Sequence, residues 1–129
     1  MNTGHAEITS TAIPISMRVA LWTCQLVCAA VFLTTGVSKL IGTHETVRVF
    51  DTMGAGQWLR YAIGLAELAG AVMIVSPPVV VFGALLLFCV MVGAVSSHLL
   101  ILGGSPALAV AFAMITGFVA WARRYQLRS

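Results

Sequence analysis

The sequence contains, at residues 79–102, the apolar stretch VVVFGALLLFCVMVGAVSSHLLIL. It lies inside a longer run, residues 68–122, that has no Asp, Glu, Lys or Arg. An α-helix needs about 20 apolar residues to cross a bilayer, so the uncharged run holds more than two crossings. We therefore predict that membrane-spanning helices are the units of this fold.

Further apolar segments lie before and after this stretch, and their ends carry helix-stopping residues. Gly42 ends the first segment, Pro77-Pro78 the second and Gly103-Gly104 the third. Long segments without alternation disfavour barrel strands, and the short connections at residues 77–78 and 103–105 favour antiparallel neighbours. The prediction is an all-α, transmembrane four-helix bundle with both termini on one side. The expected spans are residues 18–41, 58–76, 79–102 and 106–122.

Composition and charge agree with a membrane protein of one domain. Of the 129 residues, 60% are hydrophobic and only 9% are charged, whereas about 25% are charged in soluble domains. The net charge of +3 comes from few, scattered residues, so no nucleic-acid partner is expected. The expected partner of the apolar surface is membrane lipid. Residues 1–17 form a polar N-terminal segment and residues 123–129 a basic C-terminal tail. Basic residues near the expected termini (Arg18, Arg123, Arg124 and Arg128) predict that both termini are cytoplasmic.

The segment between the first two spans, residues 43–56, is the main charged loop. Val47, Phe50 and Met53 recur in it at roughly helical spacing, which favours a short helix at the membrane interface. Arg60 follows, flanked by Trp58 and Tyr61, as expected of an interfacial anchor.

Small residues recur at four-residue spacing on three of the spans. Such stripes let helix backbones approach closely in lipid, so we expect tight packing and self-association into a homo-oligomer. The stripes are Ala62, Ala66 and Gly70; Cys89, Gly93 and Ser97; and Ala109, Ala113 and Gly117.

Three ionisable side chains lie within or at the edge of the spans: Lys39, Glu67 and His98. Alternating crossings bring all three toward one membrane face. Such groups cost a few kcal/mol at membrane depth and usually face the protein interior. The hypothesis is a polar cluster in which Glu67 pairs with Lys39 or hydrogen-bonds to His98. It would bind a quinone or a lipid headgroup, or relay protons.

Each of these residues also has a structural interpretation. Glu67 can hold helices together without binding a ligand, and His98 can hydrogen-bond at the membrane interface. Lys39 can extend its ammonium to the lipid headgroups. Arg60 is a further candidate for the site, with interfacial anchoring as its alternative.

The cysteines, Cys24, Cys28 and Cys89, fit neither a disulfide framework nor a zinc site. A buried thiol relay is one interpretation of them, and hydrophobic packing is the other. A haem with two histidine ligands is excluded within one chain, because the spans contain a single histidine, and no metal site is expected.

Several motifs together resemble the DoxX and DoxX-like membrane proteins over residues 18–122. They are Thr35-Gly36-Val37-Ser38-Lys39-Leu40, Gly64-Leu65-Ala66-Glu67-Leu68-Ala69-Gly70-Ala71, and Gly93-Ala94 through His98. The resemblance implies a four-helix bundle in the cytoplasmic membrane, with Lys39, Glu67 and His98 as its polar site. The family takes its name from a subunit of a thiosulfate:quinone oxidoreductase. Other relatives look like escorts or assembly factors, so enzymatic activity is left open.

The leading hypothesis from the sequence is an accessory subunit of a membrane redox system that binds a quinone-like or lipid molecule. The alternative is a non-catalytic escort or scaffold for another membrane protein. A transporter ranks third, because four spans are few for alternating access and no inverted repeat is evident.

Overall fold

The computed structural model describes residues 13–125, and this part of the chain is helical throughout, with no strand. The predictions for residues 1–12 and for Arg128 lie outside the described residues. The helices are α2 (Ile15–Ile41), α3 (His44–Met53), α4 (Gln57–Ile74), α5 (Val80–Ser97) and α6 (Ala107–Arg123), with a 3-10 turn at Pro77–Val79 and a π-helical turn at His98–Leu102.

The helix expected in the charged segment is present as α3. Its first turn is capped by Thr43, whose side chain accepts a hydrogen bond from the Thr46 backbone N–H at 3.5 Å. It ends at Gly54, which has a φ of 76° that glycine adopts without a steric penalty. Phe50, from the face identified in the sequence, is buried.

The apolar stretch at residues 79–102 differs from the single continuous helix expected of it. α5 ends at Ser97, and the chain continues as a wider π-helical turn over His98–Leu102. The turn is wider than an α-helical turn because the Gly103 N–H donates to the His98 carbonyl, five residues earlier, at 2.9 Å. Gly103 and Gly104 then both take a φ of 70° and reverse the chain toward α6.

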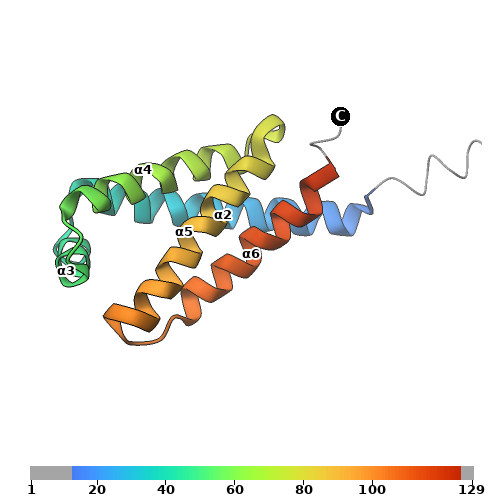
Figure 1. Ribbon diagram of the computed structural model, residues 1–129. Coiled ribbons are helices and arrows are strands. Elements are labelled where there is room, and N and C mark those ends of the chain that lie inside the picture. The colour runs from blue at the N-terminus through green and yellow to red at the C-terminus, as the bar shows by residue number, and fades with distance from the viewer. Residues whose placement is uncertain (1–12, 126–129) are drawn as a thin grey trace, which may run out of the picture.

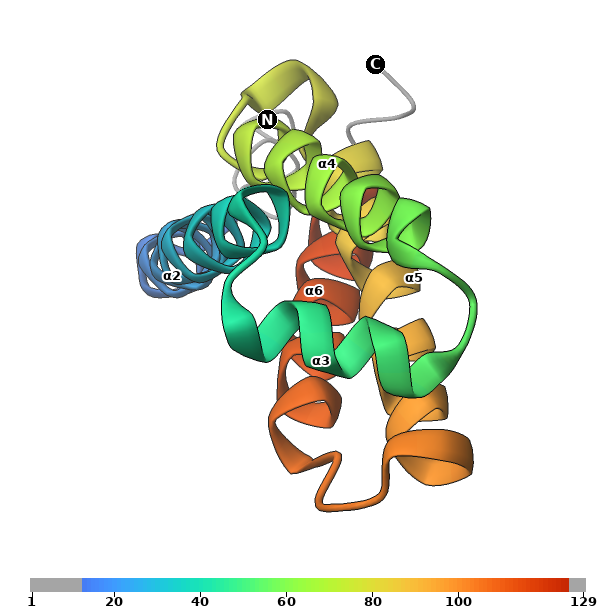
Figure 2. The ribbon, with the colours of Figure 1, turned by 90° about the vertical axis from the view of Figure 1, so that its left-hand side faces the viewer.

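Each helix packs mainly against its neighbours in the order α2, α4, α5, α6, whereas α2 and α6 meet over a smaller region. Figures 1 and 2 show that the α5–α6 pair runs obliquely to the α2–α4 pair, so that the two pairs diverge at one end. At that end α3 contacts α2, α4 and the π-helical turn, and Figure 2 shows it lying across the opening.

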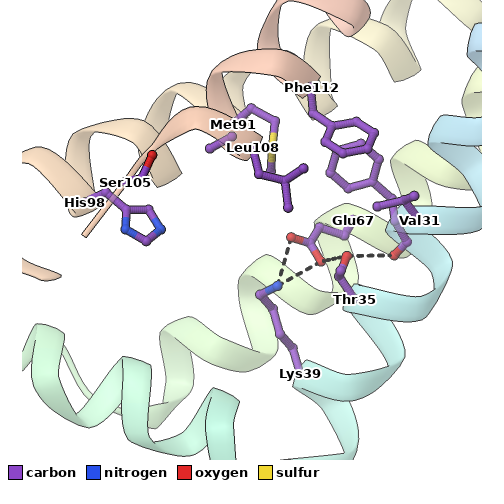
Figure 3. Close-up of a pocket in the computed structure, with 11 residues that line it drawn as sticks. Val31, Thr35, Lys39, Glu67, Met91, His98, Ser105, Leu108 and Phe112 are labelled. Carbon is purple, nitrogen blue, oxygen red and sulfur yellow. Dashed lines mark hydrogen bonds and ion pairs between the residues drawn. The ribbon is translucent and has the colours of Figure 1, made fainter. Parts of the chain in front are cut away.

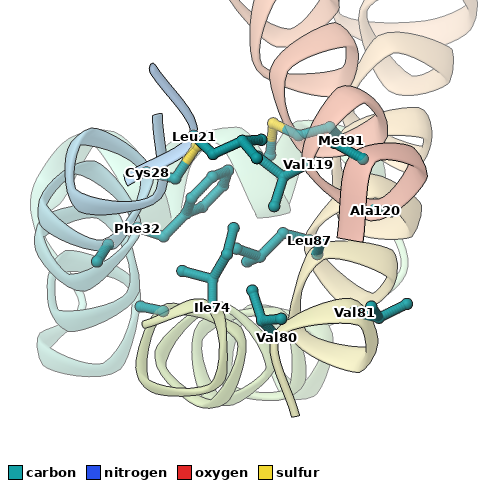
Figure 4. Packing of buried hydrophobic residues seen from close by; sticks show 14 residues of the cluster. Leu21, Cys28, Phe32, Ile74, Val80, Val81, Leu87, Met91, Val119 and Ala120 are labelled. Carbon is teal, nitrogen blue, oxygen red and sulfur yellow. The ribbon is translucent and has the colours of Figure 1, made fainter. Parts of the chain in front are cut away.

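The apolar core fills the space where the four long helices converge (Figure 4). Phe32 and Leu21 of α2 meet Ile74 of α4, Leu87 of α5 and Val119 of α6, and all five are almost wholly buried. A side chain on Gly70, which belongs to a predicted small-residue stripe, would lie only 2.5 Å from Leu87. A side chain on Gly93, in a second stripe, would meet nothing within 4 Å.

The outer surface of the helices is strongly apolar. Soluble proteins rarely expose apolar patches larger than a few hundred Å², so this surface is typical of a protein in lipid. Two segments, Ile15–Ile41 and Pro77–Leu102, are long and apolar enough to cross a membrane, and the apolar α6 is shorter. Large exposed apolar side chains include Leu26, Leu33, Leu65, Val72, Phe82, Leu85, Leu100, Leu108 and Met114.

Candidate functional site

An ion pair joins α2 to α4 inside the protein (Figure 3). The Lys39 ammonium lies 3.1 Å from one carboxylate oxygen of Glu67 and 3.2 Å from the other. The Thr35 hydroxyl donates to the second oxygen at 2.9 Å. The Glu67 side chain is 3% exposed and that of Lys39 is 18% exposed. The buried carboxylate therefore has a charged partner and an additional hydrogen bond, as a stable buried charge requires.

Two glycines bring these side chains within reach of each other. Gly36 precedes Lys39 by three residues and Gly64 precedes Glu67 by three, so each glycine shares a helix face with its charged residue. A Cβ atom on Gly36 would lie 3.0 Å from the Gly64 carbonyl oxygen. The pair thus forms where the backbones of α2 and α4 are in direct contact.

Arg60 of α4 contacts the backbone of Lys39 and so supports the Lys39–Glu67 ion pair. Its Nη1 donates to the backbone carbonyl of Lys39, and its Nε donates to the Gln57 side chain at 2.7 Å. The guanidinium also lies 4.3 Å from the centre of the Tyr61 ring, and Arg60 is 5% exposed. A cation at the C-terminus of α2 stabilises the helix end. Arg60 does not line the cavity described next, so its position is that of a support for Lys39.

A cavity of about 260 Å³ lies beside the ion pair, between α2 and α6. It is smaller than the ~300–1,000 Å³ of pockets for drug-sized ligands, and so suits a single ring or a small headgroup. Phe32 and Phe112 pack edge to face in its wall, with ring centroids 5.6 Å apart. The lining residues are Val31, Phe32, Thr35, Lys39, Glu67, Met91, His98, Ser105, Leu108, Ala109 and Phe112.

His98 lines the same cavity without touching Glu67. Its Nδ1 lies 3.0 Å from the carbonyl oxygen of Gly103, and Figure 3 shows the imidazole across the cavity from the ion pair. Of the two partners considered for Glu67, Lys39 is the one observed. The cavity nevertheless brings together Lys39, Glu67 and His98.

The three cysteines are free and have different surroundings. Cys28 is buried in the apolar core, Cys24 is half-buried and Cys89 is exposed on the outer face of α5. This arrangement favours packing over a thiol relay. Within residues 13–125, no group of three or more His, Cys, Asp and Glu side chains is placed to hold a metal ion.

A second buried polar cluster was not identified from the sequence. Gln25 of α2 accepts hydrogen bonds from Arg123 Nε at 3.2 Å and from Nη2 at 2.9 Å, and it donates to the Ile74 carbonyl at 2.7 Å. Arg123, expected in the basic tail, is the last residue of α6 and is 8% exposed. The available signal was Gln25 itself, the only side-chain amide within the first span.

The apolar outer surface, the helical architecture and the buried ion pair define a small helical membrane protein with an internal polar site. The chain belongs to the DoxX-like family, whose model matches residues 23–123, and this confirms the resemblance seen in the motifs. The match includes Lys39, Glu67 and His98. Comparison with the curated proteins and with the solved structures gave no match.

Proposed function

We propose that this protein crosses the cytoplasmic membrane four times and binds the headgroup of a quinone-like molecule in the cavity between α2 and α6. In this proposal it serves a membrane redox system as an accessory subunit. The observation that carries the proposal is the Lys39–Glu67 pair, a buried pair of charged side chains that lines a largely apolar cavity.

The proposed topology is a bundle of α2, α4, α5 and α6 with antiparallel neighbours and cytoplasmic termini. Arg123, at the end of α6, contacts Gln25 in the first half of α2, which supports placing both ends at one membrane face. Arg18, Arg123 and Arg124 would then lie toward the cytoplasm, as the positive-inside rule expects.

The charge balance of the site favours a neutral ligand. The ammonium of Lys39 is neutralised by Glu67, so an anionic phosphate headgroup would approach a carboxylate without gaining an unpaired cation. A quinone ring is neutral, flat and apolar, with an oxygen acceptor at each end. It fits the apolar walls and places one oxygen against a polar group, as small-molecule sites generally do.

Lys39 supplies the donor that this ligand needs. An ammonium group has three N–H bonds, and two of them are directed at the Glu67 oxygens. The third is available to a ligand oxygen. Glu67, which accepts a hydrogen bond from Thr35, holds the ammonium beside the cavity, and Arg60 bonds to the backbone carbonyl of Lys39. The donor is therefore oriented before the ligand binds.

Quinone binding by the purified protein in detergent tests the proposal, with decylubiquinone as the probe and equilibrium dialysis as the measurement. The double variant K39M/E67Q removes both charges without leaving one of them buried alone. We expect it to bind the probe about 10-fold more weakly, because the charge-assisted hydrogen bond is lost.

The matched control is T116V. Thr116 is fully buried in α6, bonds only within its own helix and does not line the cavity, so T116V should bind as the wild type does. Equal affinity of K39M/E67Q and wild type would contradict the proposed site. Recovery of a stoichiometric membrane partner with no quinone bound would instead favour the escort function.

A further inference from the structure

The hydrogen bond between His98 and Gly103 determines what the imidazole offers to the cavity. A carbonyl oxygen only accepts hydrogen bonds, so the proton must reside on Nδ1 of His98. In the neutral imidazole the second nitrogen, Nε2, then carries a lone pair and is an acceptor. Within residues 13–125, no other hydrogen bond of the His98 side chain is found.

The hydroxyl of Ser105 lies in the cavity lining with His98 (Figure 3). Its oxygen accepts a hydrogen bond from the Ala107 backbone N–H at 3.2 Å, which leaves the hydroxyl proton available as a donor. This side of the cavity therefore offers one acceptor, from His98, and one donor, from Ser105.

The cavity thus has two polar ends separated by the apolar side chains of Met91 and Leu108. The end at Lys39 offers a donor, and the end at His98 offers a donor and an acceptor. A ring with oxygens at opposite positions has its polar atoms arranged in the same way. A carbonyl at the His98 end would satisfy Ser105 and leave Nε2 without a partner, whereas a hydroxyl would satisfy both.

We infer that His98 is a specificity residue that makes the cavity bind the reduced, hydroxyl-bearing ring, a hydroquinone, in preference to the oxidised quinone. This inference rests on the proposed function and adds to it the form of the ligand. The physical reason is that a buried or half-buried polar atom left without a partner weakens binding more than an extra contact strengthens it.

The test compares four tetramethyl-substituted rings that differ only in their oxygens: the 1,4-hydroquinone, its monomethyl ether, its dimethyl ether and the 1,4-benzoquinone. Affinities are measured anaerobically by calorimetry on the detergent-solubilised protein, in one mildly alkaline buffer for all four rings. We expect the hydroquinone and the monomethyl ether to bind about 3- to 10-fold more tightly than the dimethyl ether and the quinone.

Two variants of His98 separate the ligand contact from the structural one. H98N places an amide N–H near the position of Nδ1, so it keeps the donor to Gly103 and removes the acceptor at Nε2. H98Q places its amide oxygen near the position of Nε2, so it keeps the acceptor. We expect H98N to abolish the preference for hydroxyl-bearing rings without weakening quinone binding, and H98Q to retain the preference.

The outcomes distinguish this inference from the proposed function. If wild type binds the quinone and the hydroquinone equally, or if H98N keeps the preference, the role of His98 is overturned and the quinone site stands. If none of the four rings binds, both are overturned.

Discussion

Gly36 and Gly64 face each other across α2 and α4, and a Cβ on either would lie 3.0 to 3.1 Å from the carbonyl oxygen of the other. This contact is closer than ordinary side chains permit, and it lies one helical turn before Lys39 and Glu67. In lipid, where helices gain little from burying apolar surface, such backbone contact is a main source of packing energy. The glycine pair therefore both joins the helices and positions the ion pair.

Substitution of Gly64 by alanine is expected to force α2 and α4 apart. The new Cβ would lie 3.1 Å from the Gly36 oxygen and from the Lys39 Cβ, and overpacking of this kind costs about 1–3 kcal/mol. G64A should therefore have a lower thermal unfolding midpoint than wild type in the same detergent.

The control for this prediction is G93A. Gly93 has open space around it, so alanine there should be neutral or stabilising through its helix propensity, by up to about 1 kcal/mol. Equal midpoints for G64A and G93A would show that the Gly36–Gly64 contact is not tight in the folded protein.

Removing one member of the ion pair should destabilise the protein more than removing both. K39M leaves the buried Glu67 carboxylate without its cation, which costs about 3–5 kcal/mol. K39M/E67Q leaves no unpaired charge buried, so its loss of stability should be smaller than that of K39M by more than about 1 kcal/mol. Free energies of unfolding of K39M, E67Q and K39M/E67Q, each relative to wild type, give the coupling energy. R48M, at an exposed position of α3, should change stability by less than about 0.5 kcal/mol. Additive losses would mean that the pair is not coupled.

The Arg123–Gln25 contact should contribute to stability although it lies outside the cavity. R123A removes two hydrogen bonds from a charged donor, each of a kind that contributes about 1.5–3 kcal/mol. R123K should not restore them, because a lysine lacks the paired N–H groups of the guanidinium. The neighbouring Arg124, directly after α6, is exposed and its side chain donates only to the nearby Trp121 carbonyl, so R124A is the control. A loss of stability in R124A as large as that in R123A would contradict a specific role for the contact.

Labelling of single cysteines with a membrane-impermeant maleimide in intact cells tests the proposed topology. We expect Asn2→Cys and Ser129→Cys to be protected and Thr52→Cys, at an exposed position of α3, to be labelled. Four crossings place both ends in the cytoplasm and α3 on the other side. Labelling of only one of the two ends would require an odd number of crossings. The background for these variants lacks the native cysteines Cys24, Cys28 and Cys89.

The sequence predicted the helical class, the positions of the helix ends at prolines and glycines, and the short helix that became α3. It also singled out Lys39, Glu67 and His98, because ionisable side chains stand out in apolar spans. The ion pair was one of two arrangements that the sequence left open, since the distance between α2 and α4 depends on their crossing and not on periodicity. Arg60 was likewise recognised as notable, but its bond to the Lys39 carbonyl is a tertiary contact.

What the amino-acid order determined by itself is local: hydropathy defines which segments are helices in an apolar setting, and glycine and proline end them, because both effects act within a few residues. The packing of the helices, in contrast, sets which polar side chains contact each other. Gln25 hydrogen-bonds to Arg123, which lies 98 residues away in the sequence. His98 hydrogen-bonds to Gly103 because the chain forms a π-helical turn there, which no residue pattern predicted. A hydrogen bond forms only when its donor and acceptor atoms lie about 3 Å apart. Such contacts therefore depend on packing geometry that the sequence specifies only through the complete fold.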